Sequence, residues 1–563
     1  MKIKKQPDDI FKEYEKAVRY NENIDLYDTV EKNQRFYKGD QWSGVNAPDM
    51  PKPVFNVIKR VISYFTAMIV SDDIGVNLSP FEETQENTSV AKILSREIDN
   101  VIEHAKVKEK TRKLIKNCAV DGDAAFYFNF NPNYDTGEEY KGIIECELID
   151  NTNILFGNPF DHDIQKQPYV IVMQRLYTDQ VKEMAKAEGL DDEYIDLIVA
   201  DRDDTERDSD VLSNDENLTT VLTKFWKEKR TVEEVNELNI VTSKEIETVH
   251  FIRCTSQVII KEDTDTGYSL YPIAYMSWED NKKSYHGQSP ITGLIPNQIF
   301  INKIFAMCMI YVTDMGFPKV VYDTNKLTKL TNKIAGLGVQ NLDTIGKLMD
   351  TFKAPDFSNQ VINLLDYTIT YTKEFMGAND AALGNMKPDN TSAIIALQEA
   401  TAVPLQLQKL GFYEFMEDSI RIIIDMMSID YGTRKCKINN KEAQELNAFE
   451  VINGQQVLMP YLDVDFNLLS KFNNQLTVTI GESTYWSEML ETQTMDNLFR
   501  NGIITDTVDY LESIPDKYLT NKQKLIDSIK EKAEKEDKFN MLVSQLSNYL
   551  PEEQMQAILN NFQ

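Results

Sequence analysis

The chain has 563 residues and a mass of 64.9 kDa, which at roughly 100–200 residues per domain predicts about three or four domains. Hydrophobic residues make up 42% of the chain, so wholesale disorder is excluded. The 60 basic and 90 acidic residues give a formal charge of −30, which argues against a protein whose task is to grip nucleic-acid phosphates tightly.

The cysteines and the apolar segments indicate a soluble protein in a reducing compartment. The cysteines are odd in number, widely spaced and never in a CxxC pair, which argues against a disulfide framework and a Cys-rich zinc module. The amino terminus, Met1–Asp9, is charged and precedes no apolar segment, so we expect no secretory signal. The longest apolar run, Ile304–Val312, is shorter than the ~18 residues of a membrane span, and we expect no membrane partner.

Helical patterns precede extended ones in the amino-terminal half of the chain. The predicted helices cover residues 8–40 (ending near Lys38-Gly39), 55–70, 90–120 and 178–187, and residues 47–53 form an irregular arm. The predicted strands cover residues 126–130, 142–148, 169–176, 218–227, 249–254 and 258–261, with turns at Asp135–Gly137 and Asp263–Gly267. Residues 191–217 hold twelve acidic side chains against Arg202 and Arg207, which predicts a solvated, mobile loop.

A long apolar helix is the most informative prediction in the middle of the chain. Ser289-Pro290 is a good helix start, a capping hydroxyl followed by proline at the first helical position. We predict that this helix runs to about Gly316, bends at Pro296 and is buried on several sides, because residues 299–312 are apolar nearly all round.

The remaining segments predict further helices and strands. A compact insert over residues 317–356 should contain a strand at 319–322, a helix and glycine turns at Gly336, Gly338 and Gly346. A second helix should run from about 357 to 376 and stop at Gly377, followed by a loop over 378–390. A long helix kinked at Pro404 should then reach about Ser428, followed by strands between 435 and 480 and a helical tail from Trp486. This mixture favours the α+β class.

The motifs of common enzymes are absent or incomplete. No phosphate-binding loop is present, since Gly346-Lys347 is followed by Leu348, and HExxH and GxSxG are missing. Asp263–Gly267 resembles the opening of a calcium loop, but the twelfth position would be Ala274 rather than Glu, so a plain turn is favoured. His104, His162, His250 and His286 lie far apart in sequence, and a structural or surface role is favoured for each.

Two carboxylate pairs leave an enzymatic alternative open. Asp121-Gly122-Asp123 and Asp161-His162-Asp163 could supply metal ligands of a nuclease if the fold brought Asp121 and Asp161 together, although carboxylates flank turn residues for capping reasons alone. We therefore predict a structural protein with no catalytic residues, no metal and no cofactor. A metal-dependent DNA-processing enzyme and a structural shell or adaptor protein remain as alternatives.

Four sequence strings, taken in order, resemble portal proteins of tailed double-stranded DNA bacteriophages. They are NQRFYKGDQW at Asn33–Trp42, NVIKRV at Asn56–Val61, YHGQSP at Tyr285–Pro290 and GANDAALG at Gly377–Gly384. The resemblance spans about residues 30–430 and depends on the order of the strings more than on any one of them.

The resemblance implies the regions of a phage portal fold. Residues 1–288 and 391–485 would form the wing, 289–316 and 357–377 the two stem helices, 317–356 the clip, 378–391 the tunnel loop and 486–563 the crown. About twelve copies would form a ring at the unique capsid vertex of the virion, assembled in the host cytoplasm, through which viral DNA is packaged and ejected. The implied partners are the terminase large subunit, head–tail adaptor proteins, the major capsid protein and scaffold.

The same resemblance assigns three sets of site residues. The stem interface between subunits would use Ile299, Phe300, Ile304, Phe305 and Ile310. The clip would dock its partners through Lys326, Lys329 and Lys333, unless these lysines only form part of a solvated surface. The tunnel loop would present Asn379, Asp380, Lys387, Asp389 and Asn390 to the channel. Lys387 would either pair with Asp380 or Asp389 or make a transient contact with DNA phosphate.

Overall fold

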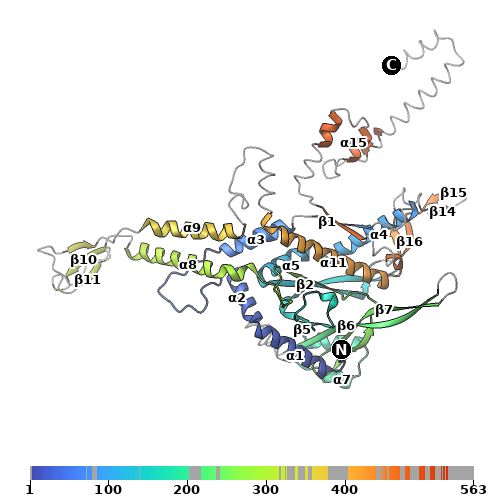
Figure 1. Ribbon diagram of the computed structural model, residues 1–563, viewed down its shortest axis with the longest axis horizontal. Coiled ribbons are helices and arrows are strands. Elements are labelled where there is room, and N and C mark those ends of the chain that lie inside the picture. The colour runs from blue at the N-terminus through green and yellow to red at the C-terminus, as the bar shows by residue number, and fades with distance from the viewer. Residues whose placement is uncertain are drawn as a thin grey trace, which may run out of the picture. The chain divides into compact units, whose positions relative to one another are not determined.

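The computed structural model describes residues 3–70, 73–78, 85–137, 140–201, 217–235, 241–315, 358–377 and 403–438, with shorter segments between 319 and 352 and between 446 and 529 (Figure 1). The chain divides into two compact units. Unit 1 comprises Met1–Val70 and Ile74–Ile480, and unit 2 comprises Ser71–Asp73 and Gly481–Gln563.

The amino-terminal helical region is more broken than the sequence predicts. The charged pattern over 8–40 forms two helices, α1 (Pro7–Asn23) and α2 (Leu26–Lys38), because Asp25 adopts a left-handed conformation with φ of 55°. The predicted end of α2 is confirmed, since Gly39 caps it at φ of 101°. The prediction of one helix over 90–120 is likewise wrong: α4 (Gln85–His104) and α5 (Val107–Asp121) are separated at Lys106, with φ of 53°.

A three-stranded antiparallel sheet lies in the largest core. It has the order β3-β2-β9, with β2 (Asp123–Asp135), β3 (Lys141–Asp150) and β9 (Ile273–Ser277). Phe126 on β2 lies opposite Leu148 and Ala274. Helix α3 (Val57–Val70), α5 and α11 (Gln406–Asp430) belong to the same core, and the rings of Phe126 and Phe415 lie 5.3 Å apart between centroids.

A five-stranded antiparallel sheet forms the second layer of unit 1. Its order is β4-β5-β6-β7-β8, with β4 (Ile154–Phe156), β5 (Val170–Tyr177), β6 (Leu218–Val235), β7 (Val241–Cys254) and β8 (Ile259–Asp265). Helix α1 covers one face, where Ile10 and Tyr14 pack against Trp226. Helix α6 (Thr178–Ala187) has the predicted bounds and packs through Val181 and Ala185.

Two predictions around this sheet need correction. The turn between the last strands lies at Thr255–Val258, where the Thr255 N–H donates to the Val258 carbonyl at 2.8 Å. Strand β8 extends to Asp265, so of the turn predicted at Asp263–Gly267 only Thr266 and Gly267 lie beyond the strand. The acidic segment begins with a short helix, α7 (Asp192–Asp196), and the Asp201 side chain is only 26% exposed, where the sequence predicts a solvated loop. Its carboxylate accepts from Arg175 at 2.6 Å, and the Arg175 side chain is 8% exposed. Residues 202–216 lie outside the described residues.

The predicted starts and ends of the two long central helices are confirmed. Helix α8 (Pro290–Met315) contains Pro296, and α9 (Asn359–Phe375) begins at a Ser358 cap and is followed by Gly377 with φ of 70°. Between them, β10 (Lys319–Asp323) pairs in parallel with β11 (Gly336–Val339) and antiparallel with β12 (Met349–Phe352). Gly336 and Gly338 therefore belong to a strand rather than to turns.

The rest of the described chain is a helix followed by short strand pairs. A 3-10 turn, Val403–Leu405, precedes α11, and the part of the predicted kinked helix before Val403 lies outside the described residues. The pairs are β13 (Thr433–Lys437) with β16 (Tyr461–Asp465), β14 (Phe449–Ile452) with β15 (Gln455–Leu458), and β1 (Asp73–Leu78) with β17 (Leu476–Gly481). Unit 2 has helical residues at 494–500 and α15 (Thr507–Ser513). The fold class is α+β, as the sequence predicts.

Candidate functional site

The α8–α9 helix pair is the feature on which the functional argument depends. The helices run antiparallel, because Asn297 donates to Thr372 at 3.3 Å while Ile301 and Ile304 pack on Leu365 further along the pair. These three apolar side chains are 7% exposed or less. One seam of the pair is therefore closed within the chain itself.

Local sequence explains where α8 begins and how it is attached. The Ser289 hydroxyl accepts from the Ile291 N–H at 3.1 Å and donates to the Ala119 carbonyl at 2.8 Å, which caps α8 and attaches it to the end of α5. Helix α8 contains only two charged residues, Lys303 and Asp314, so its solvent-facing sides are apolar as well.

A buried polar junction holds the segment that leads into α8. Asp123 Oδ2 accepts from the Tyr275 hydroxyl, from His286 Nδ1 at 2.8 Å and from the Gly287 N–H at 3.0 Å. The other imidazole nitrogen of His286 lies 3.1 Å from Asn21 Oδ1. Because Asp123 Oδ2 and the His286 ring meet partners from several elements, the junction fixes the entry of α8 into the body. The YHGQSP string is thus a structural motif.

Gly122 and Gly287 allow this junction to close. Gly122 has φ of 108°, and a Cβ atom built on it would lie 2.5 Å from the Gly287 carbonyl oxygen. Neither position has room for a side chain. The backbones of the α5–β2 turn and of the α8 entry segment therefore touch directly.

Asp121 lies beside this junction and is protonated more readily than an ordinary aspartate. Burial raises the pKa of its carboxyl from 3.8 to about 8, although Gln34 donates to both oxygens at 2.8 and 2.9 Å and opposes the shift. The carboxyl also stands at the carboxyl end of α5, where the helix dipole disfavours a negative charge.

Two buried amides on α8 hold an extended segment along one side of the helix. Gln298 accepts from the Val57 N–H at 3.0 Å and donates to the Phe55 carbonyl at 2.8 Å. Asn302 donates to Gln41 Oε1 at 2.6 Å. The Phe55 ring stacks on Phe305 with 3.8 Å between centroids and remains 47% exposed. We call residues 43–55 the arm.

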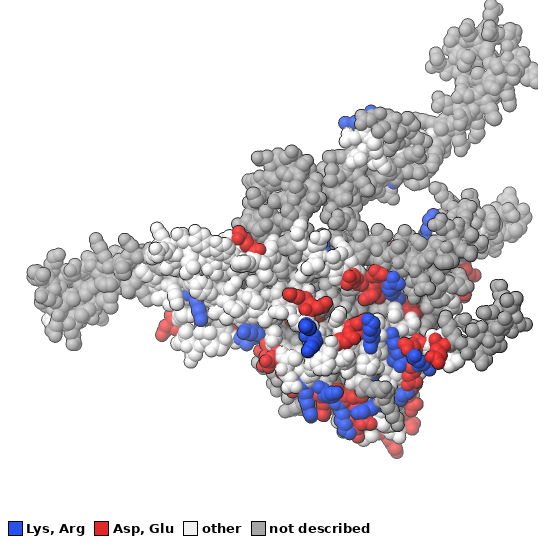
Figure 2. Space-filling model, viewed as in Figure 1, with Lys and Arg blue, Asp and Glu red and all other residues white. Residues whose placement is uncertain are grey.

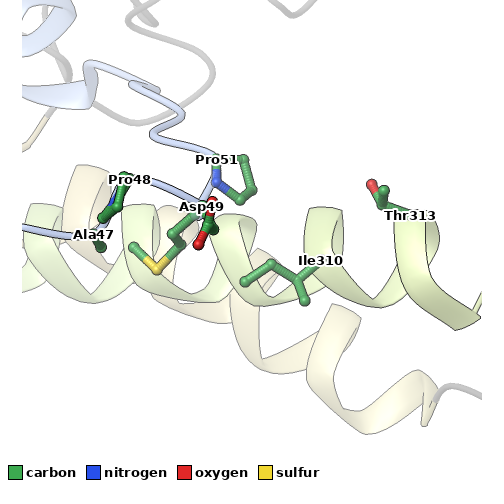
Figure 3. Close-up of a pocket in the computed structure, with 7 residues that line it drawn as sticks. Ala47, Pro48, Asp49, Pro51, Ile310 and Thr313 are labelled. Atoms are coloured by element: carbon green, nitrogen blue, oxygen red, sulfur yellow. The ribbon is translucent and has the colours of Figure 1, made fainter.

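An open pocket of about 710 Å³ lies between the arm and α8. Its lining comes from Ala47, Pro48, Asp49, Met50 and Pro51 of the arm and from Ile310 and Thr313 of α8, as Figure 3 shows. The lining is mostly proline, methionine and aliphatic surface, which suits an apolar occupant better than a charged one.

The helix pair exposes an unusual amount of apolar surface. Helix α9 carries an aromatic ladder in which Tyr367, Tyr371 and Phe375 are 60%, 52% and 84% exposed, and neighbouring rings lie 6.1 and 6.3 Å apart. On α8, Phe300 is 43% and Met307 65% exposed. Figure 2 shows few charged side chains over the pair, whereas both signs crowd the surface of the body. Such a surface marks an interaction site.

The structure separates the predicted stem-interface residues. Ile304 is buried against Leu365 inside the chain, and Phe305 lies under Phe55. Ile299 packs partly against the main core, Ile310 lines the pocket, and Phe300 is open to solvent. The expectation that residues 299–312 are buried on several sides is wrong for the single chain, because Met307, Met309 and Val312 are all 45% exposed or more. The predicted clip lysines and tunnel-loop residues lie outside the described residues.

The sequence predicts an irregular arm over residues 47–53, but it does not predict the packing of Phe55 on α8 or the aromatic ladder. The ladder leaves a signal, since Leu364, Tyr367, Tyr371 and Phe375 recur at the spacing of one helical face. The role of Phe55 leaves no such signal, because it depends on contacts across more than 240 residues, as between Phe55 and Gln298.

The carboxylates considered as metal ligands make hydrogen bonds and ion pairs with groups of the chain itself. Asp121 and Asp123 hold the junction, Asp161 accepts from the Asp163 N–H at 3.1 Å, and Asp163 caps a 3-10 turn while pairing with Lys166 at 2.7 Å. Among the described residues, no group of three or more His, Cys, Asp or Glu side chains could hold a metal ion. All five cysteines are free thiols.

One described helix has the length and composition of a membrane span. Over Pro290–Thr313, α8 is apolar enough to cross a bilayer, and 39% of its most apolar window is buried in the chain. A single helix of this kind is weak evidence for a membrane, because core helices and interface helices share its composition.

The exposed apolar surface of the α8–α9 pair is typical of a protein that assembles with other copies or partners. Comparison with known families agrees with this class. The family described as Phage P22-like portal protein matches residues 12–557, and the chain therefore belongs to this family of phage portal proteins. No curated protein matches the sequence. Membership implies a structural, oligomeric component of the capsid vertex of the virion.

Proposed function

We propose that about twelve copies of this chain close into a ring at the unique capsid vertex, through which double-stranded DNA is packaged and later ejected. The observation that carries the proposal is the α8–α9 pair, with one seam closed inside the chain and several aromatic and aliphatic side chains left bare. A closed head-to-tail ring covers such surfaces on every copy and leaves none unpaired.

The proposal assigns a role to each region. The α8–α9 pair forms the stem, and the β10–β12 unit between the two helices forms the clip. The body, with its two main sheets and α11, forms the wing, and residues 486–563 form the crown. The negative balance of −30 per chain fits a channel that DNA slides through, because a basic bore would bind many phosphates and hold the DNA.

Two contacts within this proposal concern individual residues. Lys326, Lys329 and Lys333 of the clip dock the terminase large subunit during packaging and head–tail adaptor proteins afterwards. Reversing the three lysines to Glu should leave rings intact and abolish packaging. In the tunnel loop, with Asn379, Asp380, Asp389 and Asn390, Lys387 touches passing phosphates, so Lys387→Ala should alter DNA retention without affecting assembly. Unchanged packaging would show that the three clip lysines only form part of a solvated surface. Unchanged retention would show that Lys387 only forms a local ion pair.

Negative-stain imaging of the purified chain tests the proposed function. Rings with a central hole are the expected result. Closed shells would instead indicate a capsid protein, and a chain that remains monomeric at every concentration would overturn the ring. Divalent-metal-dependent cleavage of plasmid DNA by the pure chain would support the DNA-processing alternative.

A further inference from the structure

The two lateral sides of the α8–α9 pair differ in shape and chemistry. At 100° per residue, Phe300 and Met307 lie roughly 150° around α8 from Asn302, whose side chain faces the arm. On α9, Tyr367 and Tyr371 lie roughly 140° around the helix from Leu365, which faces α8. Because the helices are antiparallel and right-handed, the ladder falls on the same side as Phe300 and Met307. The arm occupies the opposite side.

The two sides match in height along the pair. The Phe55 N–H lies 3.4 Å from Asn302 Oδ1, and its ring rests on Phe305. Ile301 and Ile304, in the same stretch of α8, pack on Leu365 of α9. Tyr367 is two residues from Leu365, a rise of about 3 Å along the helix. If the ring axis runs parallel to the helices, rotation about it keeps this height and brings the ladder of one copy level with Phe55 of the next.

The chemistry of the two sides also matches. The arm side exposes Val54 at 41% and Phe55 at 47%, and beyond them lies the pocket with Pro48, Met50 and Pro51. Aromatic rings pack well on other rings and on methionine sulfur. Asp49, which also lines the pocket, is exposed. A contact between two different surfaces of the same chain is head-to-tail, which is the type that closes into rings.

We propose that the aromatic ladder of α9 in one copy docks on the arm side of the next copy, with Tyr367 and Tyr371 against Val54 and Phe55 of the arm. This inference rests on the proposed ring and names the pair of surfaces that closes it. It differs from the stem interface predicted from the sequence at Ile304 and Phe305, which make contacts inside the chain. The arm thereby forms the surface on which α9 of the neighbouring copy docks.

A complementation experiment tests the asymmetry of the contact. Tyr367→Glu disables the ladder, and Phe55→Glu disables the arm; both side chains are about half exposed, and circular dichroism would confirm that each variant folds. Each variant alone should stay monomeric in analytical ultracentrifugation. A 1:1 mixture should stop at heterodimers, because only one productive pair of surfaces remains. Rings from either variant alone, rings from the mixture, or a mixture that stays monomeric would overturn the pairing.

Cysteine crosslinking separates this inference from the ring itself. Val54→Cys combined with Tyr367→Cys, in a Cys308→Ser background, should give a ladder of linked multimers on a denaturing gel after oxidation of the paired thiols by copper phenanthroline. The matched control places the second cysteine at Tyr134, which is 46% exposed on β2, and should give no ladder. Rings without crosslinks in the test pair would overturn the docking and leave the portal ring standing. A wild-type chain without rings would overturn the proposed function.

Discussion

The five-stranded sheet buries its apolar side chains within the chain, whereas the α8–α9 pair leaves many of them exposed. On the sheet, Ile10 of α1 and Trp226 of β6 are both fully buried, and even a charged pair, Glu13 with Lys224, is enclosed at 2.6 Å. On the helix pair, Phe375 is 84% and Met307 65% exposed. The sheet region completes its core within one chain, whereas the helix pair completes only one seam. The difference indicates which part of the molecule requires a second copy.

Breaking the enclosed ion pair should have the largest effect on the stability of the chain. Glu13→Gln leaves Lys224, which also donates to the Lys4 carbonyl at 3.0 Å, without its carboxylate, and removing one partner of a buried pair costs about 3–5 kcal/mol. Urea unfolding should report this loss. The matched control is Glu15→Gln on the same helix, whose partner Arg19 is 73% exposed, and it should change little. Equal effects of the two variants would contradict the account of the sheet region.

Two substitutions on one helix should sharpen the contrast between closed and open faces. Leu365→Ala opens a cavity in the closed seam and should destabilise the helix pair by about 2–4 kcal/mol. Tyr371→Ala removes an exposed ring and should change it by about 0.5 kcal/mol or less. Hydrogen exchange of α9 amides, measured in the monomeric Phe55→Glu background, compares them. A loss at Tyr371 as large as at Leu365 would show that the ladder is covered within the chain.

Stability should fall with rising pH because of Asp121. Its pKa is raised to about 8 by burial, so the folded chain keeps a proton that the unfolded chain releases above its ordinary pKa of 3.8. Between these values this group alone lowers stability by up to about 1.4 kcal/mol per pH unit.

Asp121→Asn tests this prediction because it keeps an acceptor for Gln34 while removing the titration. The variant should flatten the pH dependence of the unfolding midpoint between about pH 4 and pH 8. Glu183→Gln on the exposed side of α6 serves as the control and should leave the slope unchanged. A wild-type slope in Asp121→Asn would show that the carboxyl is ionised in the folded chain.

The smallest effect should come from an exposed ion-pair network on the same sheet region. Lys5 pairs with Glu228 at 3.0 Å and with Asp263, but its side chain is 38% exposed. Lys5→Ala should therefore cost about 1 kcal/mol or less. A loss comparable to that of Glu13→Gln would mean that the amino-terminal segment, rather than burial of the pair, holds α1 on the sheet.

The sequence predicts elements whose signals are local and misses those that depend on distant contacts. Ser289-Pro290 marks the start of one helix and Gly39 the end of another, and each is where its chemistry places it. The helix breaks at Asp25 and Lys106 carry no glycine or proline that would predict them. A left-handed conformation at an ordinary residue is imposed by the packing around it, so the local sequence does not predict it.

The candidate site divides in the same way. The apolar composition of α8 predicts an interface helix, yet composition does not say which side of it faces the chain's own α9. Ile304 proves to be internal and Phe300 external, although both are large apolar residues on the same helix. Asp201 shows the same limit: it lies in a segment whose composition predicts a solvated loop, but its partner Arg175 is a buried side chain on β5, 26 residues away.

A single-particle reconstruction of the purified, assembled chain tests the central claim most directly. The account predicts a closed ring of about twelve copies in which the α8–α9 pairs stand side by side and Tyr367 and Tyr371 are covered by the next subunit. A closed ring in which this ladder remained open to solvent would contradict the docking. Particles joined only through the sheet region, with the helix pairs free, would contradict the claim that the open helix pair makes this chain a ring.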